Sequence, residues 1–340
     1  MIPATNPSQR RRQLIAYFVF TYLISWAVEI PLALSYQHVI ALEVPMALHY
    51  VAPFGPLLAA VIVTLATEGF VGLPRLFRGL IPPTPLTKGG KNSASPSRQR
   101  DAGANGAGGA GTAAPAALSR EARMGDLASL TKADRSRVSL TAGGRGDSRI
   151  YVLFATVAPV VLFGLVVAVS ALVQGTWPDL RSLGQPDYLP YIGILPTFGL
   201  WLLTFGLGEE VGWRGFALPR LQAERPAFPA SLLLGTLWAC WHLPALFYRD
   251  TYIAMGLLVI PMLVTVAAVG SVVYTWLYNG SRGNLLLLVL YHGLFDFFSV
   301  WEGGVIGAGP VMTVWMVFWA VRAYQVYGPA TLCPGQKVAV

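Results

Sequence analysis

Charged side chains are scarce in this chain. Of its 340 residues, 12% are Asp, Glu, Lys or Arg, whereas 54% are hydrophobic and the mean hydropathy is +0.55. Soluble domains carry about 25% charged residues, so this composition excludes an ordinary soluble protein and predicts an integral membrane protein. Cysteines are also few: Cys240 lies in an apolar run and Cys333 lies near the end. Two such positions give neither a disulfide framework nor a cysteine-based metal motif.

Basic residues outnumber acidic ones, and the formal net charge is +8. Roughly half of the basic residues lie between Arg75 and Arg149, and others flank apolar segments, as is typical of residues that orient helices in a bilayer. This distribution does not indicate nucleic-acid binding, so we expect no nucleic-acid partner.

Eight apolar stretches approach the length of about 20 residues that a helix needs to cross a bilayer. They cover residues 14–36, 46–67, 150–174, 191–215, 230–248, 253–278, 284–301 and 305–324. The sequence therefore predicts an all-α integral membrane protein, a bundle of about eight transmembrane helices. The first stretch is too long for a signal-peptide core of ~7–15 residues, and no small-residue cleavage site follows it, so we expect a retained helix.

The loops on alternate sides of this bundle differ in basic charge. Arg10, Arg11 and Arg12 precede the first stretch, and the loops that would share their side hold most other Lys and Arg residues. Because basic loops stay in the cytoplasm, we expect a multi-pass protein of the plasma membrane with both termini cytoplasmic and an active cavity that opens toward the cytoplasm.

Residues 82–149 differ in kind from the rest of the chain. They are rich in Gly, Ala, Ser and Pro, as in GANGAGGAGTAAPAA, and such a segment cannot bury enough apolar surface to offset its ordering entropy. We expect a disordered cytoplasmic loop there. The predicted organisation is two helices in residues 1–81, this loop, a six-helix core in 150–324 and a cytoplasmic tail in 325–340.

Three charged residues interrupt the fourth apolar stretch in GEEVGWRG: Glu209, Glu210 and Arg214. Burying them in a low-dielectric site is costly, so they indicate a functional site. Glu210 and Arg214 are four residues apart and share a helix face, whereas Glu209 is rotated by about 100° and can have other partners. Adjacent carboxylates with different partners can serve as an acid/base pair. Taken alone, the cluster is better explained as a salt bridge at a helix end at the membrane surface.

Two histidines lie in the fifth and seventh stretches. His242 stands in WACWHLP and, alone, could bond a neighbouring carbonyl. His292 and Asp296 share a helix face, so Asp296 can fix the tautomer of His292 and raise its basicity. We expect the fourth, fifth and seventh helices to carry the catalytic residues and to converge on one polar pocket, where a glutamate and two histidines act on water.

The same groups offer an alternative ligand set. Zinc accepts His and Glu, so Glu209, His242 and His292 are candidates to hold it. No His-Glu-x-x-His occurs on one helix, which weakens the zinc interpretation. We expect no cofactor, and zinc bound by these three residues stays the alternative.

Aromatic residues flank the motifs. Trp213, Trp238 and Trp241 most often have packing or interface roles at such positions, although they could contact an apolar substrate. Tyr291, beside His292, either donates a hydrogen bond in the site or lies at the membrane interface.

These motifs resemble the type II CAAX prenyl protease family, which also includes bacteriocin-processing and abortive-infection membrane proteins. The resemblance rests on GEEVGWRGFALPRL, LLGTLWACWHLPALF and the pair His292 and Asp296, over about residues 195–300. It implies an intramembrane endopeptidase and assigns the roles: Glu209 activates water, Glu210 assists, Arg214 positions the glutamates, His242 and His292 stabilise the oxyanion, and Asp296 completes the site.

The chain departs from the family's pattern at two positions. Trp238 stands where Phe is usual, and Asp296 stands where eukaryotic members have Asn. The added carboxylate makes the pocket more negative, which leaves metal binding less settled. The expected partners are the lipid bilayer and a membrane-associated protein or peptide, cleaved near its C-terminus; the sequence does not define the substrate or the oligomeric state.

Two other function classes stay open. A non-catalytic family member would serve in bacteriocin immunity, secretion or scaffolding. A proton-coupled transporter would use the buried Glu, His and Asp as a proton relay. Transporters usually show internal repeats in two halves, whereas these motifs lie only in the second half.

Overall fold

Long apolar stretches form long helices in the computed structural model, which describes residues 6–81, 148–299 and 305–340. Within these ranges no strand occurs, which confirms the expected all-helical fold for them. The predicted loop at 82–149 lies outside the described residues, apart from its last two positions. The described parts of the chain belong to one compact unit.

Within the described ranges, four helices are long and apolar enough to cross a membrane. They are α1 (Pro7–Tyr36), α5 (Ser148–Gln174), α9 (Ala227–Trp241) with its continuation η7 (Leu243–Phe247), and α11 (Val259–Gly280). The apolar helices α2 (Phe54–Glu68) and α12 (Leu285–Ser299) have 15 residues each, and α13 (Val305–Thr331) follows. These helices fit a multi-pass membrane protein. The predicted number of eight crossings stays a prediction.

The fourth predicted stretch is one unbroken run of helical segments. It comprises α6 (Ile194–Trp201), η5 (Leu202–Leu207), α7 (Gly208–Glu210), η6 (Val211–Ala217) and α8 (Leu218–Glu224). Segments η5 and η6 are π-helical, so each adds a residue per turn and rotates the side chains that follow. Such π-helical turns are frequent at functional sites.

Short helical turns connect the long elements. They are η1 (Met46–Tyr50), η2 (Phe70–Gly72), α3 (Leu73–Leu76), η3 (Arg78–Leu80), η4 (Leu180–Ser182), α10 (Asp250–Met255) and η8 (Gly256–Leu258). The second predicted stretch therefore divides into η1 and α2 near Pro53, and the sixth divides into α10, η8 and α11.

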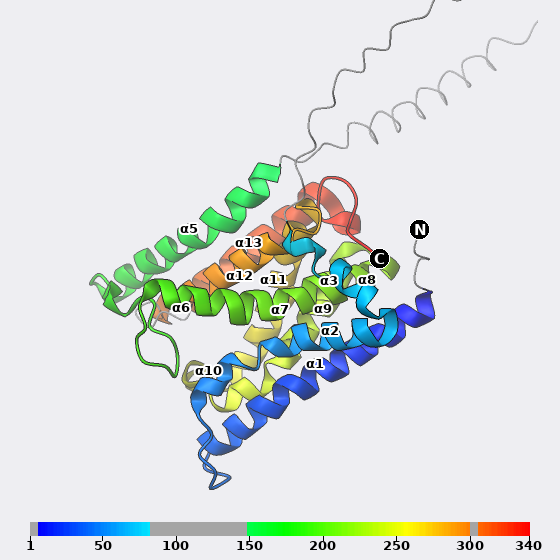
Figure 1. Cartoon of the computed structure of the whole chain (residues 1–340). Coiled ribbons are helices and arrows are strands. Elements are labelled where there is room, and N and C mark those ends of the chain that lie inside the picture. The colour runs from blue at the N-terminus through cyan, green and yellow to red at the C-terminus, as the bar shows by residue number, and fades with distance from the viewer. Residues whose placement is uncertain (1–5, 82–147, 300–304) are drawn as a thin grey trace, which may run out of the picture. The chain divides into compact units, whose positions relative to one another are not determined.

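Helix α7 lies at the centre of the packing. It contacts α2 on one side and α12 on the other, while α1 packs on α2, α9 on α11, and α5 on α12 and α13 (Figure 1). Two glycines allow the approach to α2: a Cβ on Gly208 would lie 2.7 Å from the Pro53 carbonyl oxygen, and one on Gly212 would lie 2.5 Å from that of Pro56. The two glutamates of α7 are thus held between two neighbouring helices.

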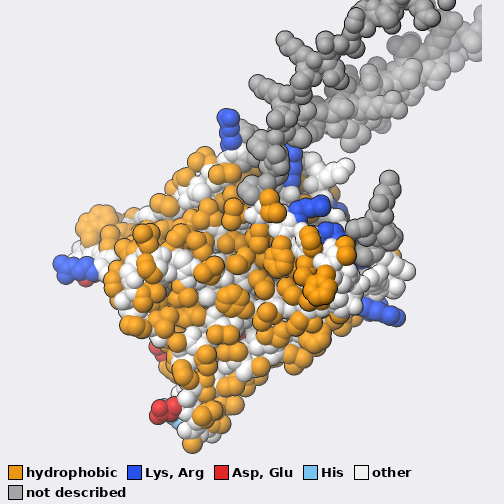
Figure 2. Space-filling model, in the orientation of Figure 1, with side chains coloured by type: hydrophobic (Ala, Val, Ile, Leu, Met, Phe, Trp, Pro, Cys, Tyr) orange, Lys and Arg blue, Asp and Glu red, His pale blue; other side chains and the backbone are white. Residues whose placement is uncertain are grey.

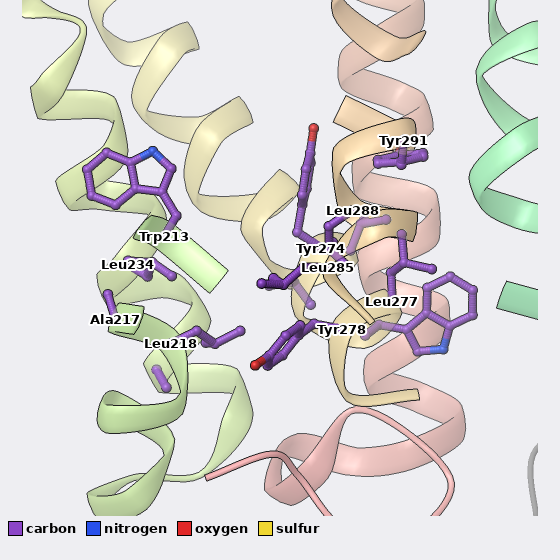
Figure 3. Close-up of a cluster of buried hydrophobic side chains, with 14 of the residues drawn as sticks. Trp213, Ala217, Leu218, Leu234, Tyr274, Leu277, Tyr278, Leu285, Leu288 and Tyr291 are labelled. Atoms are coloured by element: carbon purple, nitrogen blue, oxygen red, sulfur yellow. The ribbon is translucent and has the colours of Figure 1, made fainter. Parts of the chain in front are cut away.

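The outside of the helices is apolar. Leu23 on α1, Leu153 on α5 and Val314 on α13 are each at least 60% exposed, and hydrophobic side chains cover most of the face in Figure 2. Inside, side chains from η6, α8, α9, α11 and α12 form a core around Tyr274 and Leu288 (Figure 3). This arrangement suits a bundle whose outer surface meets lipid.

Charged pairs gather at the two ends of the bundle. At the end where α1 begins and the C-terminal residues lie (Figure 1), Arg10 approaches Glu224 at 3.6 Å and Arg220 bonds Glu68 at 2.9 Å. At the other end of α1, Arg249 bonds Asp187 at 2.5 Å. We call the first the basic end, because Arg10, Arg11 and Arg12 lie there.

Candidate active site

Glu209 and Glu210 form the last two residues of α7. Both are buried, with exposed fractions of 1% and 0%. Because consecutive helix positions differ by about 100° in direction, the two carboxylates meet different neighbours. Their bonding therefore decides what each can do chemically.

Glu210 is bonded to two groups that can carry positive charge. Its Oε1 accepts a hydrogen bond from Arg214 Nη1 at 2.6 Å and lies 2.7 Å from His292 Nδ1. Arg214 is fully buried and His292 is 2% exposed. These two bonds to Oε1 replace part of the hydration that the carboxylate loses on burial.

Glu209 is bonded by neutral donors. Trp213 Nε1 donates to its Oε2 at 3.1 Å, and Trp238 Nε1 donates to the same oxygen at 2.7 Å. The two indoles therefore fix the orientation of the carboxylate and leave its second oxygen, Oε1, unengaged by either of them. The sequence analysis expected packing or interface roles for these two tryptophans and missed both hydrogen bonds. The acceptor of an indole N–H group cannot be predicted from the sequence alone.

His292 is bracketed by two carboxylates. Its Nδ1 faces Glu210, and its Nε2 lies 3.3 Å from Asp296 Oδ2. A carboxylate only accepts hydrogen bonds, so an imidazole that bonds both carries a proton on each nitrogen and is positively charged. Asp296 is the more accessible carboxylate of the group, with its side chain 21% exposed.

His242 lies at the C-terminal end of α9. Its Nδ1 lies 2.8 Å from the Trp238 carbonyl oxygen, so that nitrogen carries the proton and Nε2 holds the lone pair of the neutral ring. Its ring is half-buried and packs against Trp241 with centroids 4.8 Å apart. The structure does not bond His242 to either glutamate.

Trp238 contacts three of the predicted site residues, which lie on different helical segments. Its ring centroid is 5.6 Å from His242 and also 5.6 Å from His292, and its indole N–H bonds Glu209. The structure thus brings Glu210, Arg214, His292 and Asp296 into one bonded network, with Glu209 and His242 attached to it through Trp238. The network draws on α7, η6, α9 and α12, the helices that correspond to the fourth, fifth and seventh predicted stretches.

Tyr274 on α11 belongs to the site and was not predicted. The Arg214 guanidinium lies 4.1 Å from the Tyr274 ring centroid and 4.9 Å from that of Trp238. Such cation–π contacts hold the guanidinium in place. Arg214 Nε and Nη2 and Glu210 Oε2 are buried without a hydrogen-bond partner among the described residues. By contrast, the hydroxyl of Tyr291 points away from His292 and lies 3.9 Å from Met316 Sδ.

The site does not match a metal centre. Among the residues that the structure describes, no group of three His, Cys, Asp or Glu side chains is placed to hold an ion. Of the proposed zinc ligands, His292 has both ring nitrogens facing carboxylates, so it has no lone pair left for a metal. Neither of the two described hollows includes a predicted site residue: one runs along α1 from Val19 to Pro31, and the other lies near Arg220.

Comparison with known proteins agrees with the motif positions. Residues 191–298 match the family described as type II CAAX prenyl endopeptidase Rce1-like. A CAAX prenyl protease 2 of Methanococcus maripaludis is 29% identical over 122 residues, which cover 32% of this chain and 40% of the relative. The chain thus spans less than half the length of that curated relative. The resemblance to the type II CAAX prenyl protease family is confirmed over residues 191–298, the region that contains both glutamates, both histidines and Asp296.

Proposed function

We propose that this chain is an intramembrane endopeptidase that cleaves a membrane-associated protein or peptide near its C-terminus. One observation carries the proposal: two adjacent buried carboxylates have unlike partners. Glu210 is tied to Arg214 and His292, whereas Glu209 receives only indole N–H bonds. Glu209 is therefore the carboxylate that can accept a proton, and Glu210 is the one that stays ionised.

The proposed reaction adds water across the peptide bond. Glu209 takes a proton from water, and the water oxygen attacks the carbonyl carbon. When the C–N bond breaks, the proton passes from Glu209 to the leaving amine nitrogen, and the hydroxyl stays on the new carboxyl group. General-base assistance of this kind accelerates such a step by about 10²–10⁴-fold.

The other residues act on charge and position. Arg214 holds Glu210, and Glu210 in turn fixes His292. The positive charge of His292, supported by Asp296, stabilises the oxyanion that forms on the carbonyl. His242 donates to that oxyanion when it is protonated on both nitrogens.

The proposed reaction uses no metal. Each glutamate already has an oxygen bound by protein donors, and Asp296 bonds His292. A proton-accepting carboxylate and a cationic imidazole supply the base and the electrostatic stabilisation that a catalytic zinc would otherwise supply.

We also propose the plasma membrane as the location, with both termini in the cytoplasm. The basic end carries Arg10, Arg11 and Arg12, and Lys337 Nζ bonds the Arg225 carbonyl oxygen there at 2.5 Å. Positive residues are retained on the cytoplasmic side.

Comparative peptidomics and N-terminomics of cells with the wild-type protein and with Glu209→Gln test the function. The expected result is a set of C-terminal fragments that occurs only with the wild-type protein. Glu224→Gln is the matched control, because it makes the same change at a carboxylate outside the candidate site, where Glu224 approaches Arg10 at the basic end. Identical fragment sets in wild-type and Glu209→Gln cells, with both proteins inserted, would overturn the proposal.

A further inference from the structure

One face of α1 is polar along most of its length. The polar side chains on this face are at most 2% exposed and belong to Gln13, Tyr17, Thr21, Ser25 and Glu29. Residues four apart share a helix face, and from the first to the last the helix rises by about 24 Å. We call this set the α1 polar stripe. Polar groups inside a membrane are costly and face the protein interior, where they mark pathways for water, protons or ions.

Several atoms of the stripe lack a hydrogen-bond partner. Tyr17 Oη, Thr21 Oγ1 and Glu29 Oε2 are buried and unpartnered among the described residues, and so is Thr64 Oγ1 on the neighbouring helix α2. Ser25 differs, because its hydroxyl donates to the Ala52 carbonyl oxygen at 2.8 Å. Unpartnered buried polar atoms are rare, and neighbouring ones are the usual anchors of ordered water.

The stripe adjoins the candidate active site. The Tyr17 ring packs edge-on against Trp213, with centroids 5.8 Å apart, and Trp213 donates its indole N–H to Glu209. Tyr17 also stacks on Phe216 at 5.0 Å. Tyr17, the second residue of the stripe, is therefore separated from the proposed base by one side chain, that of Trp213.

A hollow at the basic end is lined in part by Phe216, the residue on which Tyr17 stacks. Its volume is about 70 Å³, and its lining includes Thr64, Glu68, Arg75, Gly215, Phe216 and Arg220. A water molecule needs only about 10–15 Å³ of such volume, so the hollow has room for several. Arg220 connects it to the stripe, since its Nε donates to Gln13 Oε1 at 3.0 Å.

The other end of the stripe is closed by a chain of hydrogen bonds. Tyr248 donates to Glu29 Oε1 at 3.2 Å, and His49 lies 2.8 Å from the Tyr248 hydroxyl. Arg249 lies 3.4 Å from His49 and bonds Asp187 beyond it. Together these contacts fix the Glu29 carboxylate at the end of the stripe.

We propose that the α1 polar stripe holds ordered water and delivers it to Glu209, with entry through the hollow between Thr64, Glu68 and Arg220. Glu209 is 1% exposed, so hydrolysis there needs a built route for water, the second substrate. The delivery step rests on the proposed function, whereas the binding of water along the stripe does not.

Radiolytic hydroxyl-radical footprinting of the full-length protein in lipid nanodiscs tests the binding of water. Bound water yields radicals in place, so Tyr17 should be oxidised several-fold faster than Tyr291, a buried tyrosine whose hydroxyl contacts Met316. Thr21→Val and Thr64→Val, which keep side-chain shape, should slow oxidation of Tyr17. Ser170→Ala removes an unpartnered buried hydroxyl on α5 and should leave it unchanged. Equal oxidation of Tyr17 and Tyr291, or no effect of either valine, overturns the proposal.

Cleavage kinetics test the delivery of water. With a peptide that spans the cut found by peptidomics, Thr21→Val should lower kcat by about tenfold and leave KM unchanged, because the peptide binds as before. An unchanged kcat with slower Tyr17 oxidation contradicts delivery through the stripe. Glu209→Gln separates the two hypotheses: it should abolish cleavage yet retain Tyr17 oxidation. Cleavage by Glu209→Gln would contradict the proposed function alone.

Discussion

Two adjacent glutamates meet opposite surroundings in this protein. One oxygen of Glu209 accepts two indole N–H bonds, whereas Glu210 is bonded to an arginine and a histidine. Neutral donors orient a carboxylate without supplying the positive charge that would hold it ionised. At the scale of single residues, this difference separates the proposed base from its anionic neighbour.

Trp238→Phe should slow catalysis while keeping the aromatic ring. The change removes the 2.7 Å bond to Glu209, and a hydrogen bond to a charged group contributes about 1.5–3 kcal/mol. We expect kcat to fall by about 10–100-fold with KM little changed, measured with the identified peptide. Trp241→Phe is the control, because Trp241 Nε1 has no partner among the described residues. Equal losses for both variants would show that the loss does not come from the hydrogen bond to Glu209.

Chelation should leave the reaction intact. The base and the charge stabilisation are assigned to Glu209 and His292, so dialysis of the purified protein against a strong chelator should not change the initial rate. Metal analysis of the same sample checks that any bound ion has been removed. Loss of cleavage on chelation, restored by zinc, would contradict the metal-free reaction.

Some site residues could be predicted from sequence and others could not. The pairs Glu210 with Arg214 and His292 with Asp296 follow from the helical spacing of four. The bonds from Trp213 and Trp238 depend on the rotation of separate helices, so no local pattern contains them. Glu29 was missed because apolar residues surround it, although every fourth position from residue 13 to residue 29 is polar in the sequence.

At the scale of elements, the helical run from α6 to α8 positions both glutamates. The π-helical segments η5 and η6 flank α7 in this run. Gly208 and Gly212 allow the run to lie close to Pro53 and Pro56. Apolar windows predicted α1, α5 and α9 to within several residues. The π-helical turns have no comparable sequence signal, because they depend on packing against neighbouring helices.

Gly212→Ala should disturb this contact. The added Cβ would lie 2.5 Å from the Pro56 carbonyl oxygen, and overpacking of this kind costs about 1–3 kcal/mol. We expect a lower thermal unfolding temperature in detergent and reduced cleavage. Gly199→Ala on α6 is the matched control, because its Cβ would meet nothing within 4 Å. If the two variants unfold at the same temperature, the close approach of η6 to α2 is not under steric constraint.

At the scale of the whole molecule, charge differs between the two ends of the bundle. The start of α1 and the C-terminal residues lie at the basic end (Figure 1), together with the pairs Arg10–Glu224 and Arg220–Glu68. Acidic residues such as Asp187 and Asp250 lie at the other end of α1, where Tyr36 donates to Asp250. The proposed orientation places the basic end, with its water hollow, in the cytoplasm.

Cysteine labelling in intact cells tests this orientation. In a background with both native cysteines replaced by serine, an impermeant maleimide should label Thr176→Cys but not Gln336→Cys, because the exposed residue Gln336 is at the basic end. Labelling of both after permeabilisation confirms that both thiols are accessible. The reverse pattern in intact cells would place the basic end outside.

The activation of water by Glu209 is tested most directly by cleavage of the identified peptide in water enriched in the heavy oxygen isotope. The account predicts that the wild-type protein and Glu224→Gln place one heavy oxygen atom in the new carboxyl group, whereas Glu209→Gln forms no product. Cleavage by correctly inserted Glu209→Gln at the wild-type rate would contradict it.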